Sequence, residues 1–383
     1  MTGQRWAANF EHPVALGSFR SWLRLARSSR HIEREYLPRL LAVSLSTLLT
    51  SPLRLYESVR YGRLVDRTAI HPAPIFILGH WRTGTTHLHN LLCQDRQFGY
   101  ISTFQAMAPG FCLGGEHRLK SWLARKAQKD HPTREIDNMP LDLDAPQEES
   151  FALANMTPYA WLHLYTLPQQ AAEIFDKYGL LHNLSAAERA EWKRAYLTLL
   201  RKATLRSGGK PLVLKDPANS GRVRVLLELF PQAKFIHICR DPYRVLPSMK
   251  GVYKVVLPKA QLQHISPQQI EALVLHFYEQ LMCKYLAEKS LIPAGHLVEV
   301  KYEELEAAPL EQLRRIYDGL HLPGFAAAEP ALRAYSDAVT NFQKNTYRVD
   351  DAVIDKVNRH WKFALQEWGY PRLEPLSATQ AKA

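Results

Sequence analysis

The sequence predicts an α/β fold in which a mostly parallel sheet is covered by helices on both faces, a three-layer α/β/α sandwich. Four short apolar segments are each followed by a segment with amphipathic helical periodicity. The first apolar segment runs into a glycine-rich loop, the context in which such loops bind phosphate. With 383 residues and 46% hydrophobic content, the chain also has enough apolar side chains for a large core.

Residues 1–70 are predicted to form a helical N-terminal extension, because Arg, Leu, Tyr and Trp recur at roughly helical spacing from Phe19 to Arg67. We expect one basic face on these helices, which is either a solvated surface or a membrane contact. The stretch from Leu40 to Leu53 is the longest one of low charge, but it is shorter than the roughly 20 apolar residues of a membrane span. It predicts a helix that is either buried or placed in a membrane interface.

Residues 71–371 are predicted to form the sandwich. Its first strand is expected at Ile75 to Leu78, followed by a helix from Thr85 to Cys93. Three more pairs of strand and helix are "KPLVLKDP" with "NSGRVRVLLELFP", "AKFIHICRDP" with "YRVLPSMKGVY", and "HLVEVKY" with "EELEAAPLEQLRRIYDGL". An insertion at 110–209 separates the first two pairs and is expected to shape an acceptor pocket. Residues 372–383 are expected to form a tail.

The charge of the chain favours an anionic partner. It has 49 Lys and Arg against 37 Asp and Glu, a formal net charge of +12. Its four cysteines form no C-x-x-C pair, which favours a reducing compartment. The first residues lack the pattern of a secretory signal, so we expect a cytoplasmic protein that could associate with a membrane.

The loop "GHWRTGTTH" resembles a phosphate-binding loop that has lost its lysine. In the common G-x-x-x-x-G-K-[ST] loop, lysine follows the second glycine, whereas this sequence has Thr85 there. The backbone N–H groups and dipole of a helix N-terminus hold an anion without that lysine. Arg82 supplies a fixed positive charge, and the hydroxyls of Thr83, Thr85 and Thr86 supply further hydrogen-bond donors.

A second anion motif lies in "CRDPYRVLPS". Arg240 closes a strand there, and Ser248 follows eight residues later inside the next helix, so both can converge on one anion. Two anion sites indicate a ligand that is phosphorylated at two places. The missing lysine argues against a magnesium-dependent triphosphate enzyme, although Asp216 and Asp241 also follow strands and remain alternative metal ligands. Lys215 either touches phosphate or is a surface charge, and the same holds for Arg222, a few residues further on.

Together the two motifs resemble those of sulfotransferases that use 3′-phosphoadenosine 5′-phosphosulfate (PAPS). The resemblance extends from Pro74 to Pro371, through "FILGHWRTGTTHLHNLL", "LVLKDPANSGRVRVLLELFPQAKFIHICRDP" and "NRHWKFALQEWGYP", and it points to the bacterial branch with arginine in the loop. It implies a sandwich like that of P-loop NTPases. It also implies metal-independent transfer of a sulfuryl group from PAPS to a hydroxyl, which releases adenosine 3′,5′-bisphosphate (PAP).

The resemblance assigns the residues that bind the donor. Those that would hold the 5′-phosphosulfate are Arg82, Thr83, Gly84, Thr85 and Thr86. Arg240 and Ser248 would hold the 3′-phosphate, and Tyr302 would lie near the adenine. Arg82 would also be catalytic, since it would stabilise charge on the leaving phosphate electrostatically and without giving up a proton.

The acceptor hydroxyl must also lose a proton, which requires a general base. The branch carries a P-Q-E-x-E-F-like segment, and "PQEES" matches its start, so Glu148 is the first candidate base and Glu149 the second. The alternative is that these carboxylates belong to a solvated acidic surface or to the N-terminus of a helix. His80 and His131 are less favoured bases, and no metal site is predicted.

Two other functions remain open from the sequence. A nucleotide or small-molecule kinase would explain the glycine loop, and a non-catalytic basic module binding nucleic acid or membrane would explain the charge. Neither explains Arg240 together with Ser248. For the sulfotransferase, the acceptor would be a small molecule, lipid or glycan and not a nucleic acid. The apolar segment "ANMTPYAWLHLYTLP" and the N-terminal helices favour a hydrophobic acceptor, and the oligomeric state is open.

Overall fold

The computed structural model describes residues 12–115, 119–121, 142–339 and 348–375. The chain forms two compact units. The first unit comprises residues 1–72, 97–216 and 255–265, and the second comprises residues 73–96, 217–254 and 266–383. Each unit is therefore assembled from segments that lie far apart in the sequence.

The second unit contains three parallel strands in the order β1 (Ile75–Leu78), β3 (Lys234–Cys239) and β4 (Leu297–Lys301). Phe76 pairs with Phe235 in register, and Ile236 pairs with Val298. All four residues of β1 and five of the six in β3 are buried. Continuous burial of this kind is expected of strands that are covered on both faces.

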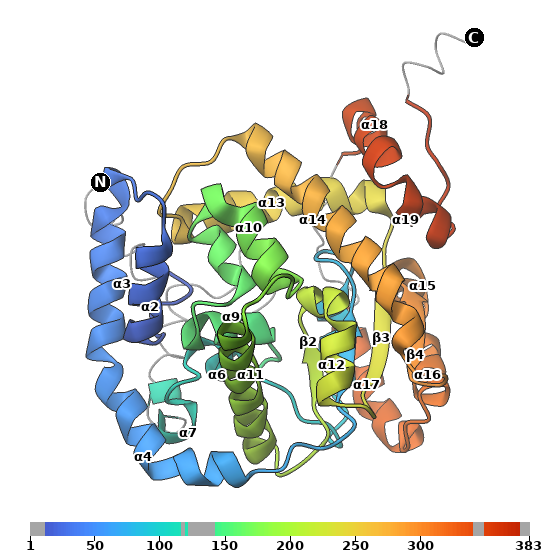
Figure 1. Ribbon diagram of the computed structural model, residues 1–383. Helices are drawn as coiled ribbons and strands as arrows, with labels where there is room; N and C mark the ends of the chain where they lie inside the picture. Colours follow the sequence, from blue (N-terminus) through green and yellow to red (C-terminus); the bar gives the residue numbers. More distant parts are fainter. Residues whose placement is uncertain (1–11, 116–118, 122–141, 340–347, 376–383) are drawn as a thin grey trace. The chain divides into compact units, whose positions relative to one another are not determined.

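The second unit also contains several helices (Figure 1). They are α5 (Thr85–Leu92), α12 (Val223–Leu229), α14 (Pro267–Glu288), α15 (Tyr302–Ala307), α16 (Pro309–Gly319), α17 (Phe325–Val339), α18 (Asp351–His360) and α19 (Lys362–Glu367). Helix α13 (Pro242–Ala260) begins in the second unit and ends in the first.

Helices lie on both faces of the sheet. On one face, the ring of His237 in β3 stacks on Tyr285 of α14, with ring centroids 4.0 Å apart. Val298 of β4 pairs with Ile236, whose side chain points to the other face because successive side chains alternate. A Cβ on Gly319 of α16 would come within 2.7 Å of Val298, so α16 packs closely on that second face. The predicted three-layer sandwich with a parallel sheet is confirmed.

The first unit is mostly helical. Its elements are α2 (Phe19–Ser28), η1 (Arg34–Tyr36), α3 (Leu37–Leu49), α4 (Ser51–Arg67), α6 (Thr103–Met107), α7 (Cys112–Gly115), α9 (Glu149–Met156), η2 (Trp161–Tyr165), η3 (Pro168–Gln170), α10 (Ala171–Ile174), η4 (Phe175–Gly179), α11 (Ala186–Arg206) and the short strand β2 (Val213–Lys215). The predicted N-terminal helices are thus confirmed as α2, α3 and α4.

A buried carboxylate fixes the N-terminal helices to the rest of the first unit. Glu57 of α4 accepts hydrogen bonds from the backbone N–H groups of Leu113 (2.7 Å) and Gly114 (3.0 Å). It also accepts one from Nζ of Lys202 in α11, at 2.5 Å. A buried charge is tolerated when it is both paired and hydrogen-bonded, so this contact specifies where α4 docks.

The predicted basic face is found on α4, where Arg60, Arg63 and Arg67 are exposed, and not on α3, whose one charged residue, Arg39, is buried. Of the two alternatives for the stretch from Leu40 to Leu53, the buried helix was wrong, since Leu41 and Leu49 of α3 are both about two thirds exposed. Its inner face buries only small or short side chains besides Arg39, and the leucines therefore point outward. Among the described residues, no helix is both long and apolar enough to cross a membrane.

Four buried histidines are held neutral. Burial lowers the pKa of His12, His80 and His237 to about 3. It lowers the pKa of His163 to about 4. The backbone N–H of Val14 donates to Nδ1 of His12, and Nε2 of that ring donates to the carbonyl of Ala260. A proton on Nδ1 would remove the first of these bonds.

We expect the free energy of unfolding to decrease as the pH falls from 6.5 to 5. The unfolded histidines take up protons near pH 6.5 whereas the folded ones do not, which costs up to about 1.4 kcal/mol per pH unit for each histidine. Urea denaturation at pH 7, 6 and 5 measures this slope. His12→Asn should reduce the slope by roughly one proton, and an unchanged slope would contradict the assignment.

Candidate active site

The loop between β1 and α5 depends on two glycines with positive φ. Gly79 has φ 144° and Gly84 has φ 96°, values that residues with a Cβ rarely adopt. A Cβ at Gly79 would lie 2.5 Å from the carbonyl oxygen of Ile238, and one at Gly84 would lie 2.2 Å from the ring of Tyr302. The close packing of the loop against β3 and α15 therefore requires both glycines.

Arg82 lies at the centre of the loop in a left-handed conformation, with φ 71°. Such a backbone costs roughly 1–2 kcal/mol for a residue with a side chain, so other contacts must hold it. Nε of Arg82 donates to Oγ of Ser248 at 2.9 Å, and the carbonyl of Arg82 accepts from Nη1 of Arg240 at 3.1 Å. The structure thus joins the residue expected at the 5′-phosphosulfate to both residues expected at the 3′-phosphate.

Tyr302 completes this group. The guanidinium carbon of Arg240 lies 4.2 Å from the centre of the Tyr302 ring, a cation–π contact. The hydroxyl of Tyr302 donates to Glu306, 2.9 Å away in the next turn of α15. The aromatic ring therefore supports the guanidinium of Arg240 and also closes the space beside Gly84.

The three threonines of the loop differ in position. Thr83 is buried, and its hydroxyl donates to the carbonyl of His80 at 2.7 Å, which stabilises the turn of the loop. Thr85 and Thr86 are the first two residues of α5. The residue before them, Gly84, has no side chain that could cap this helix.

The residues of the loop fit an anionic ligand. Nε of Arg240 is buried and has no hydrogen-bond partner among the described residues. An unsatisfied buried donor on a cationic group is costly, and an anion would satisfy it. The N-terminus of α5, capped by Gly84 alone, adds backbone donors and the positive end of the helix dipole.

The first candidate base, Glu148, belongs to the first unit and is the N-cap residue of α9. Its segment is held in place by the backbone N–H of Gln147, which donates to the carbonyl of Ile101 at 2.8 Å. Oε1 of Glu148 accepts a hydrogen bond of 2.6 Å from Nζ of Lys215, at the end of β2. The side chains of Lys215 and Glu148 are 2% and 14% exposed, so this is a nearly buried ion pair. A solvated surface is therefore the wrong interpretation of Glu148.

The second candidate, Glu149, has a different environment. It is the first residue of α9 and is only 1% exposed. Its Oε1 accepts a hydrogen bond of 3.1 Å from the hydroxyl of Tyr196 in α11. Glu149 therefore ties α9 to α11, whereas the carboxylate of Glu148 keeps limited access to solvent.

The sequence missed some buried residues and left others undecided. Burial raises the pKa of Tyr165 well above its usual value, and the negative charge of Glu148 adds to this shift. The indole of Trp161 donates to Asp216 at 3.3 Å. Both aromatic residues come from "YAWLHLY", whose aromatic content was the available signal. Lys215 and Arg222 are buried, so the surface interpretation was wrong for both.

As a general base, His80 is less well supported by the structure than Glu148 is. His80 is buried and its Nδ1 bonds the carbonyl of Trp81 at 2.8 Å. Burial lowers the pKa of His80 to about 3, which makes it a poor base near neutral pH. His131 lies outside the described residues.

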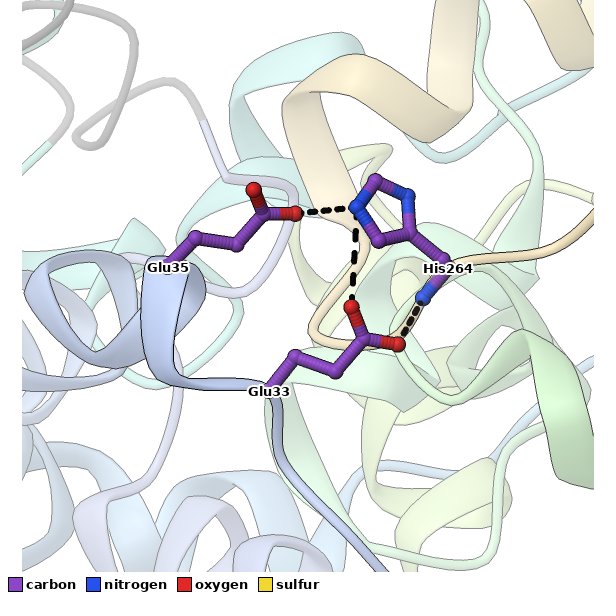
Figure 2. A group of neighbouring side chains, drawn as sticks. All are labelled: Glu33, Glu35 and His264. Atoms are coloured by element: carbon purple, nitrogen blue, oxygen red, sulfur yellow. Dashed lines mark hydrogen bonds and ion pairs between the residues drawn. The ribbon is translucent and has the colours of Figure 1, made fainter.

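Within the described residues, one group of three side chains has the spacing of metal ligands: Glu33, Glu35 and His264 (Figure 2). Nε2 of His264 contacts both carboxylates, and the backbone N–H of His264 donates to Glu33 at 2.6 Å. Glu35 and His264 are exposed. These contacts tie the η1 segment to the residues after α13, and they account for the geometry of the group.

The chain matches known proteins over most of its length. A model described as "Sulfotransferase family" matches residues 74–327. Omega-hydroxy-beta-dihydromenaquinone-9 sulfotransferase Stf3 is 33% identical over 382 residues, both in Mycobacterium bovis and in Mycobacterium tuberculosis. Each alignment covers 97% of this chain and 94% of the relative.

Two solved structures have the same fold. Sulfotransferase STF9 from Mycobacterium avium has a TM-score of 0.67 at 20% identity, over 95% of this chain and 96% of that one. Sulfotransferase STF1 from Mycobacterium tuberculosis has a TM-score of 0.64 at 17% identity, over 93% of this chain and 98% of that one. The family match and the 33% identical relatives show that this chain belongs to the sulfotransferase family.

Proposed function

We propose that this sulfotransferase takes its sulfuryl group from PAPS and transfers it to a hydroxyl of a lipid or other small hydrophobic molecule. The choice of PAPS as donor rests on one observation: Arg82 forms direct hydrogen bonds with both Ser248 and Arg240. A donor with phosphate groups at both ends of its ribose matches two anion-binding groups that share hydrogen bonds. Because the chain belongs to the sulfotransferase family, the kinase and the non-catalytic alternatives are rejected.

The proposed transfer needs no metal, because two guanidinium groups supply fixed positive charge. PAPS supplies a sulfuryl group bonded to a 5′-phosphate, a good leaving group. Arg82 would stabilise the charge that grows on this phosphate as its bond to sulfur breaks. Thr85 and Thr86 would add donors at the N-terminus of α5, and Tyr302 would orient Arg240 for the 3′-phosphate.

Glu148 is the proposed general base. In the proposed reaction the acceptor oxygen forms a bond to sulfur, and the hydroxyl proton passes to the carboxylate of Glu148. Lys215 is expected to orient this carboxylate, because it donates a hydrogen bond to one of the two oxygens. The other oxygen can then meet the acceptor. Glu149 is the weaker candidate, since its burial and its bond to Tyr196 suit a structural role.

The acceptor class rests on the relatives and on the composition of the first unit. The relatives' name specifies an omega-hydroxylated dihydromenaquinone, a lipid alcohol. In this chain the segment around η2 buries Trp161, Leu162, Leu164 and Tyr165, and an apolar environment of this kind suits a hydrophobic acceptor. We propose a cytoplasmic enzyme in peripheral contact with the membrane that holds such an acceptor; the four cysteines are free thiols, as a reducing compartment would require.

Arg240→Ala should weaken the binding of PAP by roughly 10- to 100-fold, because it removes a charge-assisted contact to the 3′-phosphate. Isothermal calorimetry in EDTA measures this and tests metal independence in the same experiment. Arg244→Ala, which removes an exposed cation four residues away, is the matched control and should bind PAP normally. Tight binding of ATP with magnesium, without any binding of PAP, would overturn the proposed donor.

Glu148→Gln should lower kcat by about 100- to 10,000-fold with little change in PAP affinity, because glutamine cannot accept the hydroxyl proton. Sulfuryl transfer to omega-hydroxy-β-dihydromenaquinone-9, as a trial acceptor, measures the effect.

Asp144→Asn is the control for the loss of one carboxylate from the same segment, since the Asp144 side chain is 53% exposed. Glu149→Gln keeps an acceptor for Tyr196 and should retain most of the activity. If Glu149→Gln is inactive while Glu148→Gln is active, the base is Glu149.

A further inference from the structure

Helix α3 exposes a face made mainly of leucines. Its five outward leucines are 43% to 68% exposed; they are Leu37, Leu41, Leu45, Leu48 and Leu49. Their spacing places them on one side of the helix, opposite the buried Arg39 and Val43. The solvent face of a helix normally carries polar or charged side chains, so this face lacks its expected contact.

Helix α4 follows α3 directly, and it also exposes apolar side chains together with positive charge. Thr50 is at once the C-cap of α3 and the N-cap of α4, and Figure 1 shows the two blue helices one after the other. The exposed apolar residues of α4 are Leu53, Leu55, Tyr56, Val59 and Leu64. Its exposed arginines lie 4, 7 and 11 residues after Tyr56 and form one stripe along the helix; they are Arg60, Arg63 and Arg67.

Both helices are firmly attached to the first unit by their inner sides. The buried guanidinium of Arg39 donates to the carbonyls of Gln261 (2.8 Å) and Pro258 (2.5 Å). Glu57 fixes α4 through Lys202 and the start of α7. The leucines are therefore held at the surface by a defined docking of α3.

We propose that the leucine face of α3 and the arginine stripe of α4 bind the surface of an anionic lipid bilayer. Leucines on a helix that lies in the interface enter the boundary of the acyl chains, and arginines pair with lipid phosphates. The net charge of +12 adds long-range attraction to such a surface. A two-fold dimer through this surface would instead bring two arginine stripes of like charge together. The choice of a bilayer rests in part on the proposed lipid acceptor.

The test is co-sedimentation of the full chain with vesicles of phosphatidylcholine alone or mixed with phosphatidylglycerol. The protein should bind the anionic vesicles and not the neutral ones, and salt should weaken binding. Leu41→Glu with Leu45→Glu should reduce binding by at least about tenfold. Replacing the three arginines by glutamine should reduce it roughly fivefold for each.

Leu291→Glu changes an exposed leucine of the second unit and is the matched control, which should bind vesicles normally. PAP binding should be unchanged in every variant, so a failure of the proposed donor site would be seen separately. Absence of wild-type binding to anionic vesicles would overturn the proposal. A dimer in light scattering that the leucine variant dissociates would also overturn it, because a second copy would then cover the face.

Discussion

The conformation of Arg82 is the constraint on which the glycine loop between β1 and α5 depends. Its left-handed backbone is unfavourable, and hydrogen bonds with Ser248 and Arg240 hold it from two sides. The loop is therefore built by three segments at once: the turn after β1, the end of β3 and the helix α13. An arginine whose backbone is fixed in this way presents its guanidinium with little freedom, which suits a group that acts by electrostatics alone.

Buried ion pairs have the corresponding role in the first unit. Glu57 with Lys202 and Glu148 with Lys215 each join elements that are distant in the sequence. Replacing one partner would leave a buried charge without compensation, which is why such pairs specify an arrangement more than they add stability. The first pair positions α4, and the second positions the proposed base. A buried ion pair thus fixes the position of a helix at Glu57 and orients the proposed base at Glu148.

The sequence predicted the strands well because each is a short apolar run bounded by glycine, proline or charge. The observed β1, Ile75–Leu78, has the predicted limits, and the helix after the loop ends one residue early, at Leu92. The carboxylate pairings could not be predicted, because Lys215 lies 67 residues from Glu148. The sequence left open whether α3 is buried or exposed for a related reason: its composition identifies an apolar helix, but tertiary packing decides whether the apolar face is covered.

The close packing of Gly84 against Tyr302 links two parts of the proposed donor site. Any side chain at position 84 would displace the ring of Tyr302, and that ring supports the guanidinium of Arg240. A side chain at position 84 would therefore disturb Arg240, which lies more than 150 positions later in the chain. The packing couples these three positions, so a substitution at position 84 also requires room to be made at position 302.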